Sequence, residues 1–173
     1  MKLLEWFKTE VTGPVLGFVV VRIWLGVRAL QTGLEKFGGK KEIETPIIVD
    51  GEPNTYGLAE VSDSKTYSFE TYNGVPAALR SKFEAEPLIP SWGLDIYDQI
   101  LGPALLLVGG FLLLGIAPKL TLLAMALLYT SLTFGLILIG QDAGIAWLGI
   151  HIILNVWALQ NVEQIRLALW NKA

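Results

Sequence analysis

Long stretches without charge are the feature that most restricts how this chain folds. Between Gln99 and Gln141 the single charged residue is Lys119, and from Ala143 to Val162 there is none. Only 17% of the 173 residues are charged, whereas average globular usage is about 25%. A soluble domain of this length needs a charged surface, so the sequence indicates a small membrane protein.

Four apolar segments each approach the roughly 20 residues that a helix needs to cross a bilayer. They predict helices at about residues 14–37, 96–117, 119–140 and 143–161. Pro118 separates the second segment from the third, and Gln141-Asp142 separates the third from the fourth. We therefore predict an all-α fold, an integral membrane four-helix bundle that forms a single domain over residues 1–173.

The distribution of basic residues predicts the orientation of the bundle. Four spans place both termini on one side, and the terminal segments together with the turn at 118–119 are richer in Lys and Arg than the opposite side. The positive-inside rule then places both termini in the cytoplasm, with the chain in the cytoplasmic membrane. The amphipathic segment before Gly13 predicts a surface-lying helix. The segment after Gln160 fits either such a helix or a continuation of the last span.

Residues 38–95 are expected to form a long extracytoplasmic loop with some structure of its own. Pro46–Val49 and Thr66–Tyr72 are rich in β-branched and aromatic residues, which favours short extended segments. Pro76–Ala85 is typical of a short helix with a proline near its first turn. A connection of this length usually serves as a cap or a docking surface.

Composition excludes several kinds of chemistry. The chain has no cysteine, which excludes disulfides, iron–sulfur clusters and zinc sites with thiolate ligands. His151 is the one histidine, so a haem held by two histidines is excluded and we expect no intrinsic cofactor. The net charge of −3 lacks the basic footprint of a nucleic-acid-binding protein. The lipid bilayer is the expected surrounding.

Polar groups at matched depths in the predicted helices suggest a binding site. Ionisable side chains inside a bilayer are costly, so each is a functional candidate by default. Counting residues from the helix ends places one such group of side chains near the middle of the membrane: Arg28, Gln31, Tyr129, His151 and Asn155. A quinone carbonyl accepts hydrogen bonds from side chains of these types. We predict a pocket that opens toward the outer side, in which His151 relays protons to Asp98 or Asp142.

Structural interpretations of the same residues stay open. Arg28 can pair with Glu35 about two turns further along the first helix, which would make it a structural ion pair. Arg22 can extend toward the inner surface or bind a lipid phosphate. A lone histidine such as His151 can also be an ordinary core residue.

Short motifs in the first and second helices resemble the DoxX/DoxD family of small membrane proteins. The first helix has an arginine and a glycine spaced as Arg22-x-x-x-Gly26, followed near its end by Gly33-x-x-Lys36-Phe. The second contains the glycine pair Gly109-Gly110, followed by a short basic turn. The similarity covers roughly residues 15–37 and 100–160, about half of the chain. The residues that carry it are Arg22, Gly26, Gly33, Lys36, Gly109 and Gly110.

The resemblance implies a membrane subunit of a redox complex, because DoxD-type members belong to thiosulfate:quinone oxidoreductase and DoxX-type members often scaffold redox enzymes. Two functions follow as hypotheses. The first is a quinone-linked redox subunit, with quinone as the ligand and other redox subunits as partners. The second is a non-catalytic anchor or assembly subunit that docks a redox enzyme through the outer loop. A small transporter is disfavoured because the helices show no broken repeats.

Overall fold

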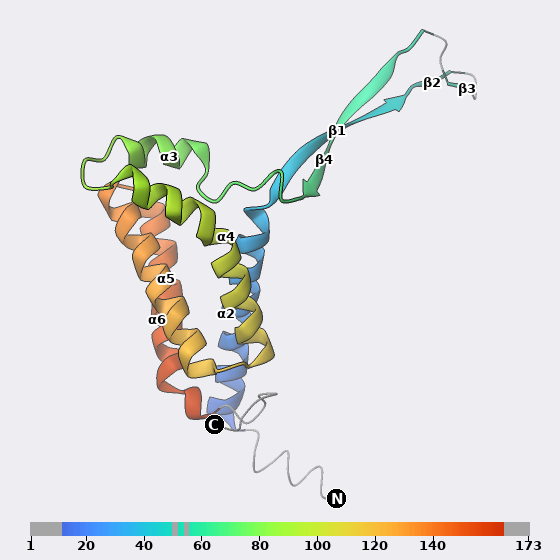
Figure 1. Cartoon of the computed structure of the whole chain (residues 1–173). Coiled ribbons are helices and arrows are strands. Elements are labelled where there is room, and N and C mark those ends of the chain that lie inside the picture. Colours follow the sequence, from blue (N-terminus) through green and yellow to red (C-terminus); the bar gives the residue numbers. More distant parts are fainter. Residues whose placement is uncertain (1–11, 50–51, 54–55, 165–173) are drawn as a thin grey trace, which may run out of the picture.

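The computed structural model describes residues 12–49, 52–53 and 56–164, and four long helices form its main body (Figure 1). Their bounds are α2 Gly13–Glu35, α4 Ser91–Leu114, α5 Pro118–Leu138 and α6 Asp142–Gln160. Each helix is long and apolar enough to cross a membrane. The chain is therefore a multi-pass membrane protein, and the predicted set of four membrane helices is confirmed.

Prolines and glycines set the helix ends much as the sequence indicates. Pro14 lies in the first turn of α2, and α5 begins at Pro118, where a missing N–H costs nothing. α4 ends at Gly115, which adopts a φ of 71° that a residue without a side chain reaches readily. The predicted start of α4 at residue 96 is wrong, because the helix begins at Ser91.

Glycines allow α2 and α4 to pack closely along their length. A Cβ on Gly109 would lie 2.9 Å from the carbonyl oxygen of Gly26, and a Cβ on Gly33 would lie 3.0 Å from the backbone nitrogen of Leu106. The two backbones meet directly at Gly109, and leucine side chains of α4 pack over Gly26 and Gly33, as small residues commonly allow in membrane helix pairs. Gly26 and Gly33 thus both contact another helix. Gly110, in contrast, has open space at its Cβ position.

The second helix pair, α5 and α6, lies beside the first and completes the bundle (Figure 1). The core between the pairs contains fully enclosed side chains from all four helices, such as Phe18 of α2, Leu112 of α4, Met125 of α5 and Ala158 of α6. A third of the apolar stretch is buried in both α2 and α4 (33%), against 22% in α5 and 17% in α6. The first membrane helix is therefore enclosed to the same degree as α4.

The segment between α2 and α4 corrects the all-α prediction. In place of a long, partly structured loop over residues 38–95, a two-stranded antiparallel ribbon projects away from the bundle (Figure 1). Strand β1, Gly38–Pro46, pairs with β4, Ala59–Tyr67, from Gly38 opposite Tyr67 to Pro46 opposite Ala59. Two short strands, β2 (Ile48–Val49) and β3 (Glu52–Pro53), extend it. We call this hairpin the ribbon, and the bundle end from which it rises the ribbon end.

A short helix covers part of the ribbon end. Helix α3, Ala77–Glu84, follows Pro76 and confirms the helix predicted for this segment. It packs toward α5, since a Cβ on Gly135 would lie 3.4 Å from the Phe83 ring. At the opposite end of the bundle, α6 stops at Gln160 and a 3-10 turn, η1 (Val162–Gln164), follows. The amphipathic segments predicted before Gly13 and after Gln160 lie outside the described residues, apart from residue 12 and residues 161–164.

Candidate functional site

His151 lies between two aromatic side chains from different helices. Its ring centroid is 5.7 Å from that of Tyr129 on α5, in an edge-to-face arrangement, and 6.5 Å from that of Trp24 on α2. His151 and Tyr129 are both buried, whereas Trp24 is half exposed on the outside of the bundle. Two residues that the sequence predicts at one depth, Tyr129 and His151, are thus brought into contact.

One hydrogen bond fixes how His151 can act. Its Nδ1 lies 2.8 Å from the carbonyl oxygen of Trp147, one turn earlier on α6. Because a carbonyl oxygen only accepts, Nδ1 carries the proton, and in the neutral ring Nε2 is then an acceptor. The sequence predicts His151 as a donor to a ligand, whereas this hydrogen bond leaves Nε2 of the neutral ring to accept a hydrogen bond or a proton.

Arg28 connects this aromatic cluster with a cavity at the ribbon end. Its Nη1 donates to Oε1 of Gln31 at 2.7 Å, so the guanidinium is directed toward the ribbon end. Arg28 also interacts electrostatically with Tyr129. We call the cavity the outer cavity. It measures about 360 Å³, and its lining residues are Arg28, Gln31, Thr32, Glu35, Lys36, Gly38, Asn73 and Pro76.

The charges around the outer cavity are unevenly paired. Glu35 binds Lys65 of the ribbon, with Nζ 2.7 and 2.8 Å from its two carboxylate oxygens, and this bond to Glu35 raises the pKa of Lys65. Lys36 has no ion pair among the described residues. Burial lowers the pKa of Lys36, an effect that the negative charge of Asp98 partly opposes. The cavity thus contains two cationic groups whose charges no neighbouring carboxylate neutralises by direct contact.

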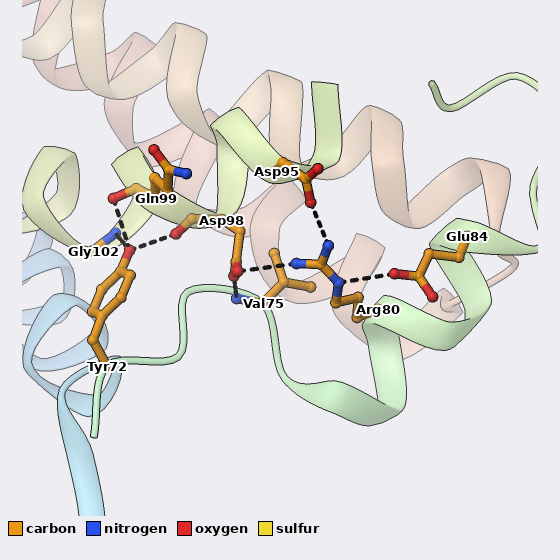
Figure 2. A network of polar contacts seen from close by, with 8 residues as sticks. All are labelled: Tyr72, Val75, Arg80, Glu84, Asp95, Asp98, Gln99 and Gly102. Atoms are coloured by element: carbon orange, nitrogen blue, oxygen red, sulfur yellow. Dashed lines mark hydrogen bonds and ion pairs between the residues drawn. The ribbon is translucent and has the colours of Figure 1, made fainter. Parts of the chain in front are cut away.

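An arginine on α3 joins the ribbon end to the first turns of α4 (Figure 2). Arg80 donates to Oδ2 of Asp98 at 3.0 Å, and it also pairs with Asp95 and with Glu84. The other oxygen of Asp98 accepts from the backbone N–H of Val75 at 2.5 Å. These contacts, first with Asp95 and then with Glu84, raise the pKa of Arg80. The pair with Asp95 neutralises the one acid among residues 91–95, in the first turns of α4.

Tyr72 forms a second connection to α4 (Figure 2), next to Pro103, which lies inside the helix. Its hydroxyl shares its hydrogen between the carbonyl oxygens of Asp98 (2.6 Å) and Gln99 (3.1 Å), and it accepts from the N–H of Gly102 at 3.2 Å. Gly102 permits this approach, because a Cβ there would lie 2.6 Å from the Tyr72 ring. α4 bends in this region, first crossing the ribbon end and then running beside α2 (Figure 1).

The predicted site is therefore divided into parts. Arg28 and Gln31 line the outer cavity, while Tyr129 and His151 meet deeper in the bundle. Asn155 lies one turn beyond His151 on α6 and is fully buried, away from the outer cavity. The structural alternative of an Arg28–Glu35 pair is wrong, because Gln31 binds Arg28 and Lys65 binds Glu35.

Four buried side-chain atoms have no hydrogen-bond partner within the described part of the chain. They are Nε and Nη1 of Arg22 and both side-chain atoms of Asn155. Gly17 lies against Trp157, and Trp24 against His151, so α2 and α6 run antiparallel. This register puts Arg22 and Asn155 within roughly one helical turn of the same level. Buried groups of this kind usually bind water or a ligand.

Several residues that shape the site were not identified from the sequence. Trp24 has no evident role from the sequence alone, although it precedes Arg28 by four residues, so the two side chains lie on the same face of α2. Lys65, Tyr72 and Arg80 act on residues far away in the chain, and no local spacing indicates such contacts. Of the six motif residues, Gly26, Gly33 and Gly109 lie in the α2–α4 interface and Lys36 lines the cavity.

Comparisons of the chain with protein-family models, with curated proteins and with solved structures find no match. The resemblance to the DoxX/DoxD family gains no support from them and stays a prediction based on the motifs alone.

Proposed function

We propose that the protein is a membrane subunit of a quinone-linked redox complex and that Arg28, Tyr129 and His151 bind the head group of a quinol. One observation carries the proposal: the bond of Nδ1 to Trp147 leaves Nε2 of His151 as an acceptor, and the His151 ring lies 5.7 Å from the ring of Tyr129. The hydroxyl of Tyr129 has no hydrogen-bond partner among the described residues. Hydroxyl groups of a quinol donate hydrogen bonds, so they match the free nitrogen of His151.

The same three residues have complementary chemical tasks in this proposal. His151 takes one proton as the quinol is oxidised, while both electrons pass to a redox centre of a partner subunit and the second proton passes to water. Tyr129 can donate to the ring oxygen or accept from it. The N–H groups of Arg28 that Gln31 leaves available stabilise negative charge on that oxygen. In quinone reduction the same steps run in reverse.

Direct measurement of quinone binding tests this function. Purified protein is titrated with a short-chain quinone and with its quinol. His151→Gln should weaken quinol binding about tenfold, the usual effect of losing a hydrogen bond to a strong acceptor. Tyr129→Phe should weaken binding of both forms. Tyr97→Phe is the matched control. The hydroxyl of Tyr97 lies 2.7 Å from Oγ of Ser131, and Tyr97 makes no hydrogen bond or ring contact with His151 among the described residues. Equal affinities in all variants would mean that the cluster is structural.

A non-catalytic anchor is the second candidate, and the ribbon favours it. Its two strands have nine residues each and extend away from the helices without a covering layer in the described chain. Isolated two-stranded hairpins are marginally stable, so a binding partner would stabilise the ribbon. The expected orientation, with both termini in the cytoplasm, presents the ribbon to a partner outside the cytoplasmic membrane.

Shortening the ribbon separates the two candidates. Glu42 and Asp63 lie opposite each other, so an Asn-Gly turn can replace residues 43–62 and close a shorter hairpin. This deletion keeps the Lys40–Asp63 and Glu35–Lys65 ion pairs. An anchor should lose its co-purifying redox enzyme and keep quinone binding. Retention of the partner by the shortened protein would reject docking through the ribbon.

A further inference from the structure

We infer that the outer cavity binds a phosphate group, held between the guanidinium of Arg28 and the ammonium of Lys36. The inference is separate from the proposed quinol site, with which it shares only Arg28. Both cations line one cavity of about 360 Å³. A tetrahedral oxoanion has several acceptor oxygens, so it can bind a planar guanidinium and a compact ammonium at the same time.

The contacts around the two cations leave them available to a ligand. Nη1 of Arg28 donates to the neutral amide of Gln31, and this bond orients the guanidinium. The positive charge of Arg28 has no carboxylate partner among the described residues. Asp98 is the acid that acts on Lys36, yet its two oxygens are bound to the backbone of Val75 and to Arg80. Arg28 and Lys36 are both partly buried, and a bound anion would offset the cost of keeping such cations without a counter-ion.

Glu35 is the one acid in the cavity lining, and a lysine of the ribbon forms an ion pair with its carboxylate. Lys65 binds both of its carboxylate oxygens from outside the cavity lining. This ion pair keeps Glu35 from competing with an anion for Arg28 and Lys36. The arrangement gives a directional prediction, because removing Glu35 and removing Lys65 should change anion affinity in opposite directions.

Two sources could supply the phosphate group. The cavity lies at the end of membrane helices, where lipid head groups are found, and its volume leaves space beyond a phosphate for the glycerol of a lipid. A free phosphate compound in solution has the same chemistry. Purified protein in neutral detergent is therefore offered phosphatidylglycerol, diacylglycerol as the lipid without phosphate, and inorganic phosphate, with retention of lipid followed by native mass spectrometry and phosphate binding by calorimetry.

The variants test the site independently of the source. Lys36→Gln should weaken binding about tenfold, in line with the loss of a charged hydrogen bond, and Lys36→Arg should restore most of it. Lys82→Gln is the matched control, because Lys82 is exposed on α3 and does not line the cavity. Glu35→Gln should strengthen binding and Lys65→Gln should weaken it, each by roughly two- to fivefold for such exposed charges.

Each outcome decides the matter. Binding of phosphatidylglycerol alone assigns the site to lipid, and binding of inorganic phosphate identifies a soluble ligand. The inference is overturned if neither binds, if Lys82→Gln weakens binding as much as Lys36→Gln, or if the Glu35 and Lys65 variants shift affinity in the same direction. Quinol titration of the Lys36 variant separates this result from the proposed function, since Lys36 should leave quinol affinity unchanged.

Discussion

The hydroxyl of Tyr72 lies at the place in α4 where Pro103 removes a backbone hydrogen bond. In an unbroken helix the N–H of residue 103 would donate to the carbonyl oxygen of Gln99. Proline has no N–H, and the Tyr72 hydroxyl donates to that oxygen instead, at 3.1 Å. A side chain from the segment that follows the ribbon thus completes the backbone bonding of a membrane helix.

Tyr72→Phe should lower the free energy of unfolding by about 1–3 kcal/mol, the usual cost of leaving buried polar groups without partners. The carbonyl oxygens of Asp98 and Gln99 and the N–H of Gly102 would all lose a partner. Thermal unfolding in detergent measures the effect. Tyr56→Phe is the control, because Tyr56 is 87% exposed and its hydroxyl binds no described residue. Identical melting temperatures for the two variants would contradict this role of Tyr72.

Neighbouring glycines on α4 should respond very differently to the same substitution. Gly109→Ala puts a Cβ 2.9 Å from the backbone atoms of Gly26 and Leu30, so α2 and α4 must separate. We expect destabilisation of about 1–3 kcal/mol from this overpacking. Gly110→Ala has open space and should be neutral or slightly stabilising. Unfolding experiments on the pair check this, and equal stabilities would argue against close backbone contact.

Lys36→Gln should raise the melting temperature at neutral pH. Burial lowers the pKa of Lys36, so between that lowered value and about 10.4, the ordinary value for lysine, the unfolded state binds more protons. The stability cost of Lys36 is therefore full below the lowered pKa, shrinks as the pH rises from that value toward about 10.4, and is absent above it. The advantage of the variant should shrink in alkaline buffer. If the melting-temperature advantage of Lys36→Gln grew as the pH rises, the pKa of Lys36 would not be lowered in the folded protein.

The arrangement of the helices predicts which positions share a side of the membrane. Ser64 in the ribbon and Lys119 in the first turn of α5 lie at opposite ends of the bundle (Figure 1). Because the chain has no cysteine, Ser64→Cys and Lys119→Cys each introduce a unique label site. A membrane-impermeant thiol reagent should label Ser64→Cys from outside intact cells and Lys119→Cys only after permeabilisation. The reverse pattern would invert the topology.

The sequence predicts the bundle well because the bundle depends on local signals. Lengths of apolar segments and the break at Pro118 are visible in the chain itself, and the structure confirms both. The ribbon was missed for a physical reason. Its strands bury neither face, so the alternation of apolar and polar residues that identifies a half-buried strand does not occur in Gly38–Pro46.

The candidate site was predicted in part, because depth can be counted along a helix and lateral position cannot. Counting placed Tyr129 and His151 at one level, and they are in contact. The partner of Glu35 was not predictable in the same way. Arg28 is near it in sequence, yet Lys65 from the ribbon binds Glu35, and only the folded chain brings those two residues together.

The length of the ribbon gives its tip mechanical leverage on the bundle. Nine residues per strand extend roughly 30 Å, about the thickness of the hydrocarbon layer, from a root fixed to the last turn of α2. At this root, Oγ1 of Thr71 donates to the carbonyl oxygen of Phe37 at 2.6 Å, and Lys65 binds Glu35. A load at the tip therefore acts as a torque on the end of the helix that contains Arg28.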